Sequence, residues 1–132
     1  MEPLAAVIEL LRKALPDLQA VYLFGSRATG DAGPGSDYDL AVLPPRPIDS
    51  VDRWVLQERL AEILRTDVDL VDLRAASTVM RASVLRTART LYDGAPTERA
   101  FFEAYALADY ARLNEERRGI LEDIHERGNI YG

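Results

Sequence analysis

Residues 25–40 read GSRATGDAGPGSDYDL, a glycine-rich turn that ends in two alternating aspartates. The turn follows a short β-rich run at residues 20–24 and leads into a second one at residues 39–43. A glycine directly after a strand lets the backbone approach a ligand, and the next amides can point at an anion. The hydroxyls of Ser26 and Ser36 can donate to phosphate oxygens. The stretch therefore fits a phosphate-binding turn, and it equally fits a surface hairpin whose glycines only form the turn.

Asp37 and Asp39 stand at the start of the second β-rich run. Residues two apart in a strand point to one face, about 6.6 Å apart along the chain. These two carboxylates therefore project together, while Leu40 and Val42 face the core. Two carboxylates this close repel unless a cation lies between them, and Mg²⁺ combines one or two carboxylates with substrate phosphates. The pair is a candidate metal site, and the simpler interpretation is a solvated strand end.

A second acidic segment, DVDLVDL at residues 67–73, predicts a third strand. Asp69 has apolar neighbours on both sides, where a buried and unpaired carboxylate would be costly. If this strand lies about 4.8 Å from the first pair, Asp69 completes a set of three carboxylates. Asp67 points to the same face and is the second choice. Asp72 points to the opposite face, and we expect it to cap the helix after Arg74.

Apolar spacing along the rest of the chain predicts an α/β fold of the α+β type. The few strands should form a short mixed sheet with the helices on one side, in a single domain spanning residues 1–132. We expect helices at residues 4–15, from Asp49 or Ser50 to Leu64, at 75–85 and at 96–127 with Gly119 as the point of any kink, and an extended edge at 89–94.

The composition excludes several classes of protein. The 132 residues carry a net charge of −6 and no cysteine, and their one histidine is His125. Disulfides, thiolate nucleophiles and zinc–cysteine sites are excluded, Ser-His-Asp chemistry has no candidates, and the cytoplasm is the expected compartment. No apolar run approaches the ~18 residues of a membrane span, and the acidic balance argues against a broad nucleic-acid-binding surface. Any catalysis must use carboxylates, hydroxyls, arginines, backbone amides or metal ions.

The order Gly25-Ser26, ten residues, then Asp37-Tyr38-Asp39 resembles the Gly-Ser-x10-Asp-x-Asp motif of minimal nucleotidyltransferases of the DNA polymerase β-like superfamily. The third acid of that family lies on a later strand, where Asp69 fits. The chain length, the DLVDL strand and the C-terminal YARLNEERRGILEDIHERGNIYG are similar to antitoxins of the MNT type, which pair with HEPN ribonuclease toxins.

This resemblance implies a protein adenylyltransferase that uses ATP and two Mg²⁺ ions. AMP would pass to a tyrosine hydroxyl of the cognate toxin, pyrophosphate would leave, and the modified toxin would be neutralised. Asp69 would also accept the proton, since the chain offers no other evident base. The implied metal ligands are Asp37, Asp39 and Asp69, and the implied phosphate contacts are Gly25, Ser26 and Ser36.

Four arginines and the C-terminus have two interpretations each. Arg27 either adds positive charge to the turn or points to solvent. A second group of arginines, behind the third strand, either meets phosphates or the toxin or forms ion pairs with the protein's own acidic surface. This cluster consists of Arg81, Arg86 and Arg89. Residues 120–131 exceed what a core of this size needs, so we expect them to dock a partner or a second copy, and Tyr131 is a candidate self-modified acceptor.

Three other functions compete with this interpretation. A nucleotidyltransferase acting on a small-molecule hydroxyl usually carries a further substrate domain, for which 132 residues leave no room. An antitoxin that acts by binding alone would not need the three aspartates. A DNA-binding repressor would need a basic recognition helix, which we do not find, so neither DNA nor a membrane is an expected partner.

Overall fold

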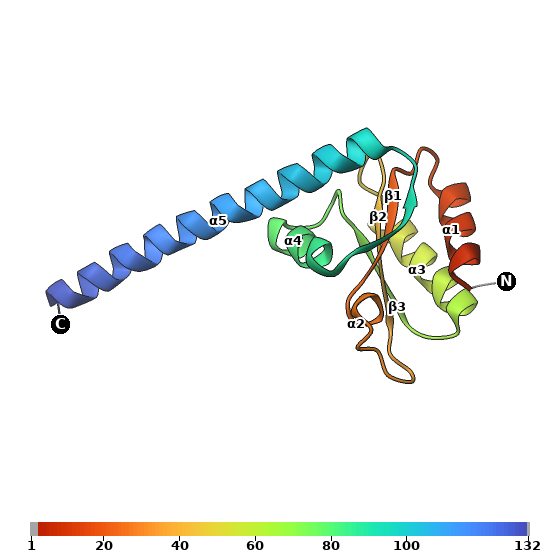
Figure 1. Ribbon diagram of the computed structural model, residues 1–132, viewed down its shortest axis with the longest axis horizontal. Helices are drawn as coiled ribbons and strands as arrows, with labels where there is room; N and C mark the ends of the chain where they lie inside the picture. Colours follow the sequence, from red (N-terminus) through yellow and green to blue (C-terminus); the bar gives the residue numbers. More distant parts are fainter. Residues whose placement is uncertain (1–2, 132) are drawn as a thin grey trace.

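Four strands form the central sheet of the computed structural model, which describes residues 3–131, with side chains as far as Ile124 (Figure 1). Across the sheet the order is β3-β2-β1-β4. The inner strand β1 is antiparallel to β2 on one side and to β4 on the other, and the second inner strand, β2, is parallel to β3. The strands are β1 (Ala20–Phe24), β2 (Tyr38–Leu43), β3 (Val68–Asp72) and β4 (Arg89–Asp93).

Helices cover both faces of this sheet. One buried cluster joins α1 and α3 to one face, and a second joins α4 and the first part of α5 to the other. The expectation that all helices lie on one side is wrong, because residues 20–23 and 40–43 are buried at every position and so need cover on both faces. The helices are α1 (Pro3–Ala14), α2 (Ser26–Thr29), α3 (Ser50–Leu64), α4 (Thr78–Thr87) and α5 (Pro96–Tyr131).

The predicted mixed α/β fold with a long C-terminal helix is confirmed, and the helix boundaries follow their caps. The Asp49 carboxylate accepts from the amides of the first turn of α3, as expected. Helix α4 begins at Thr78, three residues later than predicted, because the Ser77 hydroxyl accepts from the amide of Met80. Helix α5 is unbroken at Gly119.

The free edge of β3 is closed by two side chains of α3. Gln57 Oε1 accepts from the amide of Leu70 at 2.9 Å, and Arg53 Nη1 donates to the Leu70 carbonyl at 3.0 Å. An exposed edge strand otherwise offers its unpaired backbone groups to another chain. At Leu70 these side chains occupy the positions that a pairing strand would take.

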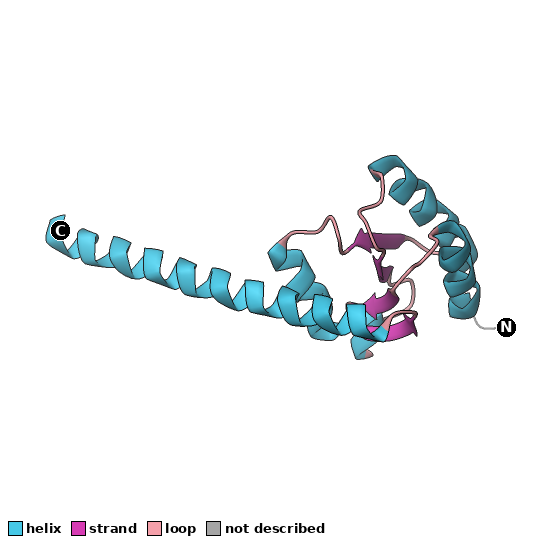
Figure 2. Ribbon diagram, turned by 90° about the horizontal axis from the view of Figure 1, so that it is seen from above, coloured by secondary structure: helices cyan, strands magenta, loops and turns pink. Residues whose placement is uncertain are grey.

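Only the beginning of α5 is anchored to the body. Tyr22 in β1 donates to Glu103 Oε1 at 2.8 Å, and Arg99 bridges Glu103 and Asp93. Phe102 lies buried in the cluster beneath these groups. Farther along, α5 leaves the body and projects alone (Figure 2). None of the helices in the described part of the chain is long and apolar enough to cross a membrane.

Candidate active site

Asp39 and Asp69 lie side by side at matching positions of the parallel pair β2–β3. Register partners in neighbouring strands point to the same face, about 4.8 Å apart. Asp37 lies two residues earlier, just ahead of β2. The prediction that the third strand lies beside the first acidic pair is confirmed. The carboxylates of Asp37, Asp39 and Asp69 lie at the end of the sheet where β2 and β3 begin, which is termed the acidic edge.

The electrostatics of this edge disfavour three bare negative charges. Burial, and then the charges of Asp69 and Asp37, raise the pKa of Asp39 above its usual range. Within residues 3–124, no group of three or more His, Cys, Asp or Glu side chains is already arranged to hold a metal ion. The charges of Asp69 and Asp37 nevertheless act on Asp39, and a hard cation would suit these carboxylates as oxygen donors.

The apolar neighbours of Asp69 in the sequence do not bury it. Its side chain is exposed, because β3 is an edge strand with open surface beside it. The cost of burying an unpaired carboxylate therefore does not arise at Asp69. The stronger reason to consider this residue is its position next to Asp39. Asp67 is also exposed and lies just ahead of β3, where its carbonyl accepts from the amide of Tyr38.

Gly25 brings the backbone of the turn directly against Asp39. Its φ is +70°, and a Cβ at this position would collide with the Asp39 carboxylate. The amide of Gly25 donates to Thr87 Oγ1 at 3.1 Å, at the end of α4. Ser26 then opens the short helix α2. Only glycine combines this φ with this close approach.

Arg27 holds the glycine-rich loop in place. Its guanidinium donates to the Ser36 carbonyl and stacks 3.9 Å from the ring centre of Tyr38. The Ser36 hydroxyl accepts from the amide of Gly33 at 2.9 Å and can still donate its own hydrogen. Arg27 therefore does not simply point to solvent: its charge stays within the turn, where it tethers the segment that leads into Asp37.

Asp72 does not cap α4. It is only 4% exposed, and its carboxylate accepts from the amides of Ile48 and Arg74 at 2.7 and 2.9 Å. The cap prediction is wrong because Ser77 takes that role, and Asp72 instead joins two loops beneath the sheet edge. Its contacts are structural and lie on the opposite side of the strand from Asp69.

The arginine cluster behind β3 divides in two. Arg81 donates to the carbonyls of Leu73 and Arg74, at 2.8 and 2.9 Å, so its guanidinium is engaged in holding the chain. Arg86 and Arg89 are exposed. Arg81 therefore has a structural role that neither prediction for the cluster described.

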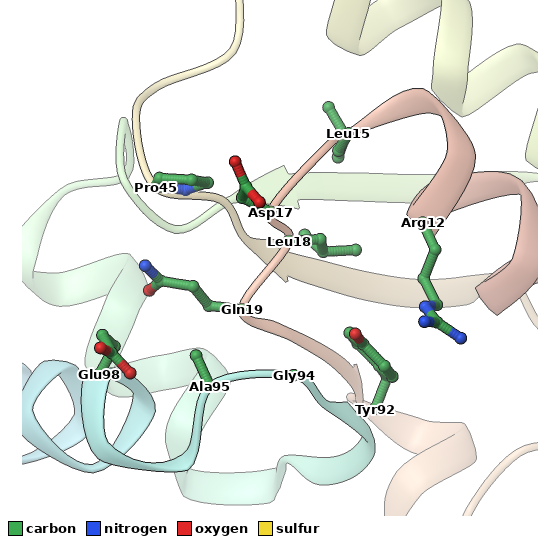
Figure 3. A pocket seen from close by; sticks show the side chains of 10 residues that line it. All are labelled: Arg12, Leu15, Asp17, Leu18, Gln19, Pro45, Tyr92, Gly94, Ala95 and Glu98. Atoms are coloured by element: carbon green, nitrogen blue, oxygen red, sulfur yellow. The ribbon is translucent and has the colours of Figure 1, made fainter.

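Two surface depressions differ in their chemistry. One of about 520 Å³ lies at the far end of β1 from Gly25, where Arg12, Gln19, Tyr92 and Glu98 line it (Figure 3). The other, of about 430 Å³, is lined by Asp69. The first depression is larger, but neither the glycine turn nor the acidic edge contributes to it. The candidate site is therefore placed at the acidic edge, on the basis of its carboxylates and of Gly25.

Thr87 is the residue that sequence reasoning missed. It holds the amide of Gly25 across a separation of 62 residues. A threonine at the end of a helix is ordinary in sequence, and only the packing of α4 against β1 reveals its contact.

The chain is similar to known proteins along most of its length. Residues 6–97 match the family model described as "Polymerase beta, Nucleotidyltransferase". The protein adenylyltransferase MntA of Shewanella oneidensis is 41% identical over 118 residues, which cover 89% of this chain and 84% of that protein.

Two solved structures resemble the chain along nearly its whole length. One is a toxin–antitoxin with AMP-PNP, at 38% identity and a TM-score of 0.84, covering 95% of this chain and 99% of that one. The other is a tri-AMPylated Shewanella oneidensis HEPN toxin in complex with MNT antitoxin, at 36% identity and a TM-score of 0.78, covering 93% and 96%.

Proposed function

The chain belongs to the polymerase β nucleotidyltransferase family and to the group of the MntA protein adenylyltransferases, and on that premise we propose that it is an antitoxin that transfers AMP from ATP to a tyrosine hydroxyl of a HEPN-type toxin. One observation carries the proposal: the parallel register that sets Asp39 beside Asp69, with Gly25 packed against Asp39. The resemblance to a toxin–antitoxin structure with AMP-PNP supports ATP as the nucleotide.

Three carboxylates would hold two Mg²⁺ ions. Asp37 and Asp39 are assigned to the ion that accompanies the triphosphate, and Asp69 shares the second. Burial, and then the charges of Asp69 and Asp37, raise the pKa of Asp39, and a nearby cation would favour its ionised form, which supports this assignment. When bound, the ions neutralise phosphate charge and make the acceptor hydroxyl easier to deprotonate.

The glycine turn would hold the outer phosphates. The first amides of a helical turn have no partner within that turn, and α2 begins at Ser26. Gly25 keeps the backbone close enough for these amides to reach a ligand beside Asp39. Ser36 adds a hydroxyl donor, positioned by Arg27.

The transfer is a displacement at the α-phosphorus. The tyrosine oxygen forms a bond to phosphorus, the bond to the bridging oxygen of the β-phosphate breaks, and pyrophosphate leaves. The exposed carboxylate of Asp69 can accept the phenolic proton and release it to solvent. The chain thus supplies charge, position and a proton acceptor.

The projecting part of α5 would bind the partner. Ile120, Leu121 and Ile124 lie in the second half of α5 and are 58–65% exposed. Apolar side chains gathered on a surface mark interaction sites. Tyr131, the candidate self-modified acceptor, has its side chain outside the described residues.

Labelled ATP tests the proposed reaction. The protein is incubated with α-labelled ATP and Mg²⁺, with and without its HEPN-type partner, and we expect label on a partner tyrosine. Label on a small molecule would support the antibiotic-type alternative, and no label would support an antitoxin that acts by binding alone.

Two substitutions test the aspartates. Asp37→Asn and Asp39→Asn should each abolish transfer while the protein stays folded. Asp31→Asn, a change of the same kind at an exposed position of the same loop, should transfer at the wild-type rate. Wild-type transfer by both test variants would exclude the two-metal assignment.

A further inference from the structure

A groove of about 430 Å³ runs beside the free edge of β3. Asp69 and Val71 line it from the strand, Arg53 from α3, and Ser77 and Met80 from the start of α4. Asp69 belongs both to this groove and to the acidic edge, because it is the register partner of Asp39.

The sheet sets the glycine turn and the groove on opposite sides of Asp39. Asp39 has a register partner on each side: Phe24 in β1, the residue before Gly25, and Asp69 in β3. Gly25 packs on Asp39 from the β1 side. The order across the sheet is therefore the glycine turn, Asp39, Asp69 and the groove.

This order decides from which side an acceptor can attack. In nucleotidyl transfer, the attacking and leaving oxygens lie roughly in line on opposite sides of phosphorus. If the outer phosphates rest on the Gly25–Ser26 turn, pyrophosphate leaves on the β1 side. The attacking hydroxyl must then approach from the β3 side, where the groove lies.

The groove favours side-chain recognition over strand addition. Gln57 and Arg53 already occupy the outward amide and carbonyl of Leu70, so an incoming peptide cannot pair with β3 there. Met80 presents an apolar thioether, 41% exposed, on the groove wall. A flexible thioether is a favourable neighbour for an aromatic ring, so the groove suits an inserted aromatic side chain.

From these contacts we propose that the groove between β3 and the start of α4 receives the tyrosine-bearing segment of the partner protein. The ring lies against Met80 and the hydroxyl points toward Asp69. The inference rests on the proposed adenylyltransferase function and adds to it the route by which the acceptor enters.

Met80→Glu and Val79→Glu form a matched pair for the test. The two residues are neighbours in α4 with 41% and 42% exposure, and only Met80 lines the groove. We expect Met80→Glu to lower the rate of AMP transfer to the HEPN-type partner by about tenfold or more, and Val79→Glu to change it less than about twofold. Binding of a fluorescent ATP analogue with Mg²⁺ should be unchanged in both.

The outcomes separate the inference from the function. Equal transfer by the two variants, with the wild type active, would overturn the groove and leave the function standing. Failure of the wild type to label its partner would instead overturn the proposed function.

A photocrosslinker gives a second readout that does not depend on activity. A benzophenone amino acid at position 80 should crosslink to the partner peptide that carries the acceptor tyrosine, and one at position 79 should not. Crosslinks to that peptide from position 79 alone would overturn the inference.

Discussion

The amide of Gly25 donates a hydrogen bond to the hydroxyl oxygen of Thr87, 3.1 Å away. Thr87 is the last residue of α4, and the same helix packs on α5 through the cluster that contains Val84 and Phe102. The turn assigned to the phosphates is thus held from behind by the last residue of α4, the helix whose first turn lines the groove beside Asp69.

Loss of this hydrogen bond should weaken nucleotide binding. Thr87→Val keeps the shape of the side chain and removes the acceptor, so we expect the KM for ATP to rise several-fold while kcat changes little. The stability loss should be about 1 kcal/mol, the usual contribution of one hydrogen bond. Thr87→Ser, which restores the hydroxyl, should recover the wild-type KM, and a KM that is high in the serine variant too would contradict this role.

Gly25→Ala should disrupt the site by collision. The new Cβ meets the Asp39 carboxylate at a φ of +70°, and we expect transfer to fall below detection at a stability cost of about 1–3 kcal/mol.

Gly35→Ala is the control for Gly25→Ala. Gly35 has a similar φ of +79° with no atom within 4 Å of its Cβ position, so the variant shares the backbone strain without the collision. Transfer assays and thermal melts compare the two. Equal loss of transfer in both would mean that strain alone explains the effect.

Asp39 should make the metal-free protein less stable at neutral pH. A carboxyl with a raised pKa in the folded state stabilises the fold below its unfolded pKa, and this contribution is lost as the pH rises through the folded value. Asp39→Asn should therefore melt higher than the wild type at pH 7 in EDTA, by about 1–3 °C given solvent screening. The difference should shrink toward about pH 4.

Melting curves between pH 4 and 8 measure this difference. Asp31→Asn, at an exposed carboxylate that is not among the charges acting on Asp39, should show no such pH-dependent gain. A melting temperature of Asp39→Asn that stays at or below that of the wild type throughout the range would refute the expected repulsion.

The projecting end of α5 should matter for partner binding and little for folding. Deletion of residues 120–132 should weaken the complex with the HEPN-type partner, measured by titration calorimetry, with the melting temperature unchanged. The double change Leu121→Ser and Ile124→Ser should reproduce most of the loss. Glu115→Ser with Glu116→Ser, exposed positions on the same helix, should not. Undiminished binding after the deletion would remove α5 as a docking element.

The sequence predicts the strands well because their signals are local. The runs at residues 20–24 and 39–43 have high β-propensity and clear stops, and both strands form there. The same runs are apolar without alternation, a pattern that indicates burial on both faces of the sheet. The prediction of helices on one side does not take this pattern into account. Asp72 could not be predicted, because its partners Ile48 and Arg74 are set by loops that meet only in the folded chain.

The sequence points to all three aspartates, but the structure supports Asp69 for a different reason. The apolar neighbours of Asp69 single out its charge in the sequence, yet its side chain is exposed. Asp69 is instead supported by its register with Asp39, which depends on how β2 and β3 pair in the folded chain. The metal roles, the single domain over residues 1–132 and the cytoplasmic location stay predictions.

Helix α5 has a consequence for how many times the enzyme acts on one partner. Its 36 residues span about 54 Å, and the body holds only its beginning. If the partner binds the projecting end as proposed, it would stay tethered when its acceptor withdraws from the groove, and the local concentration of that acceptor would remain high. Successive AMP units would then be added in one encounter, and modification would be processive.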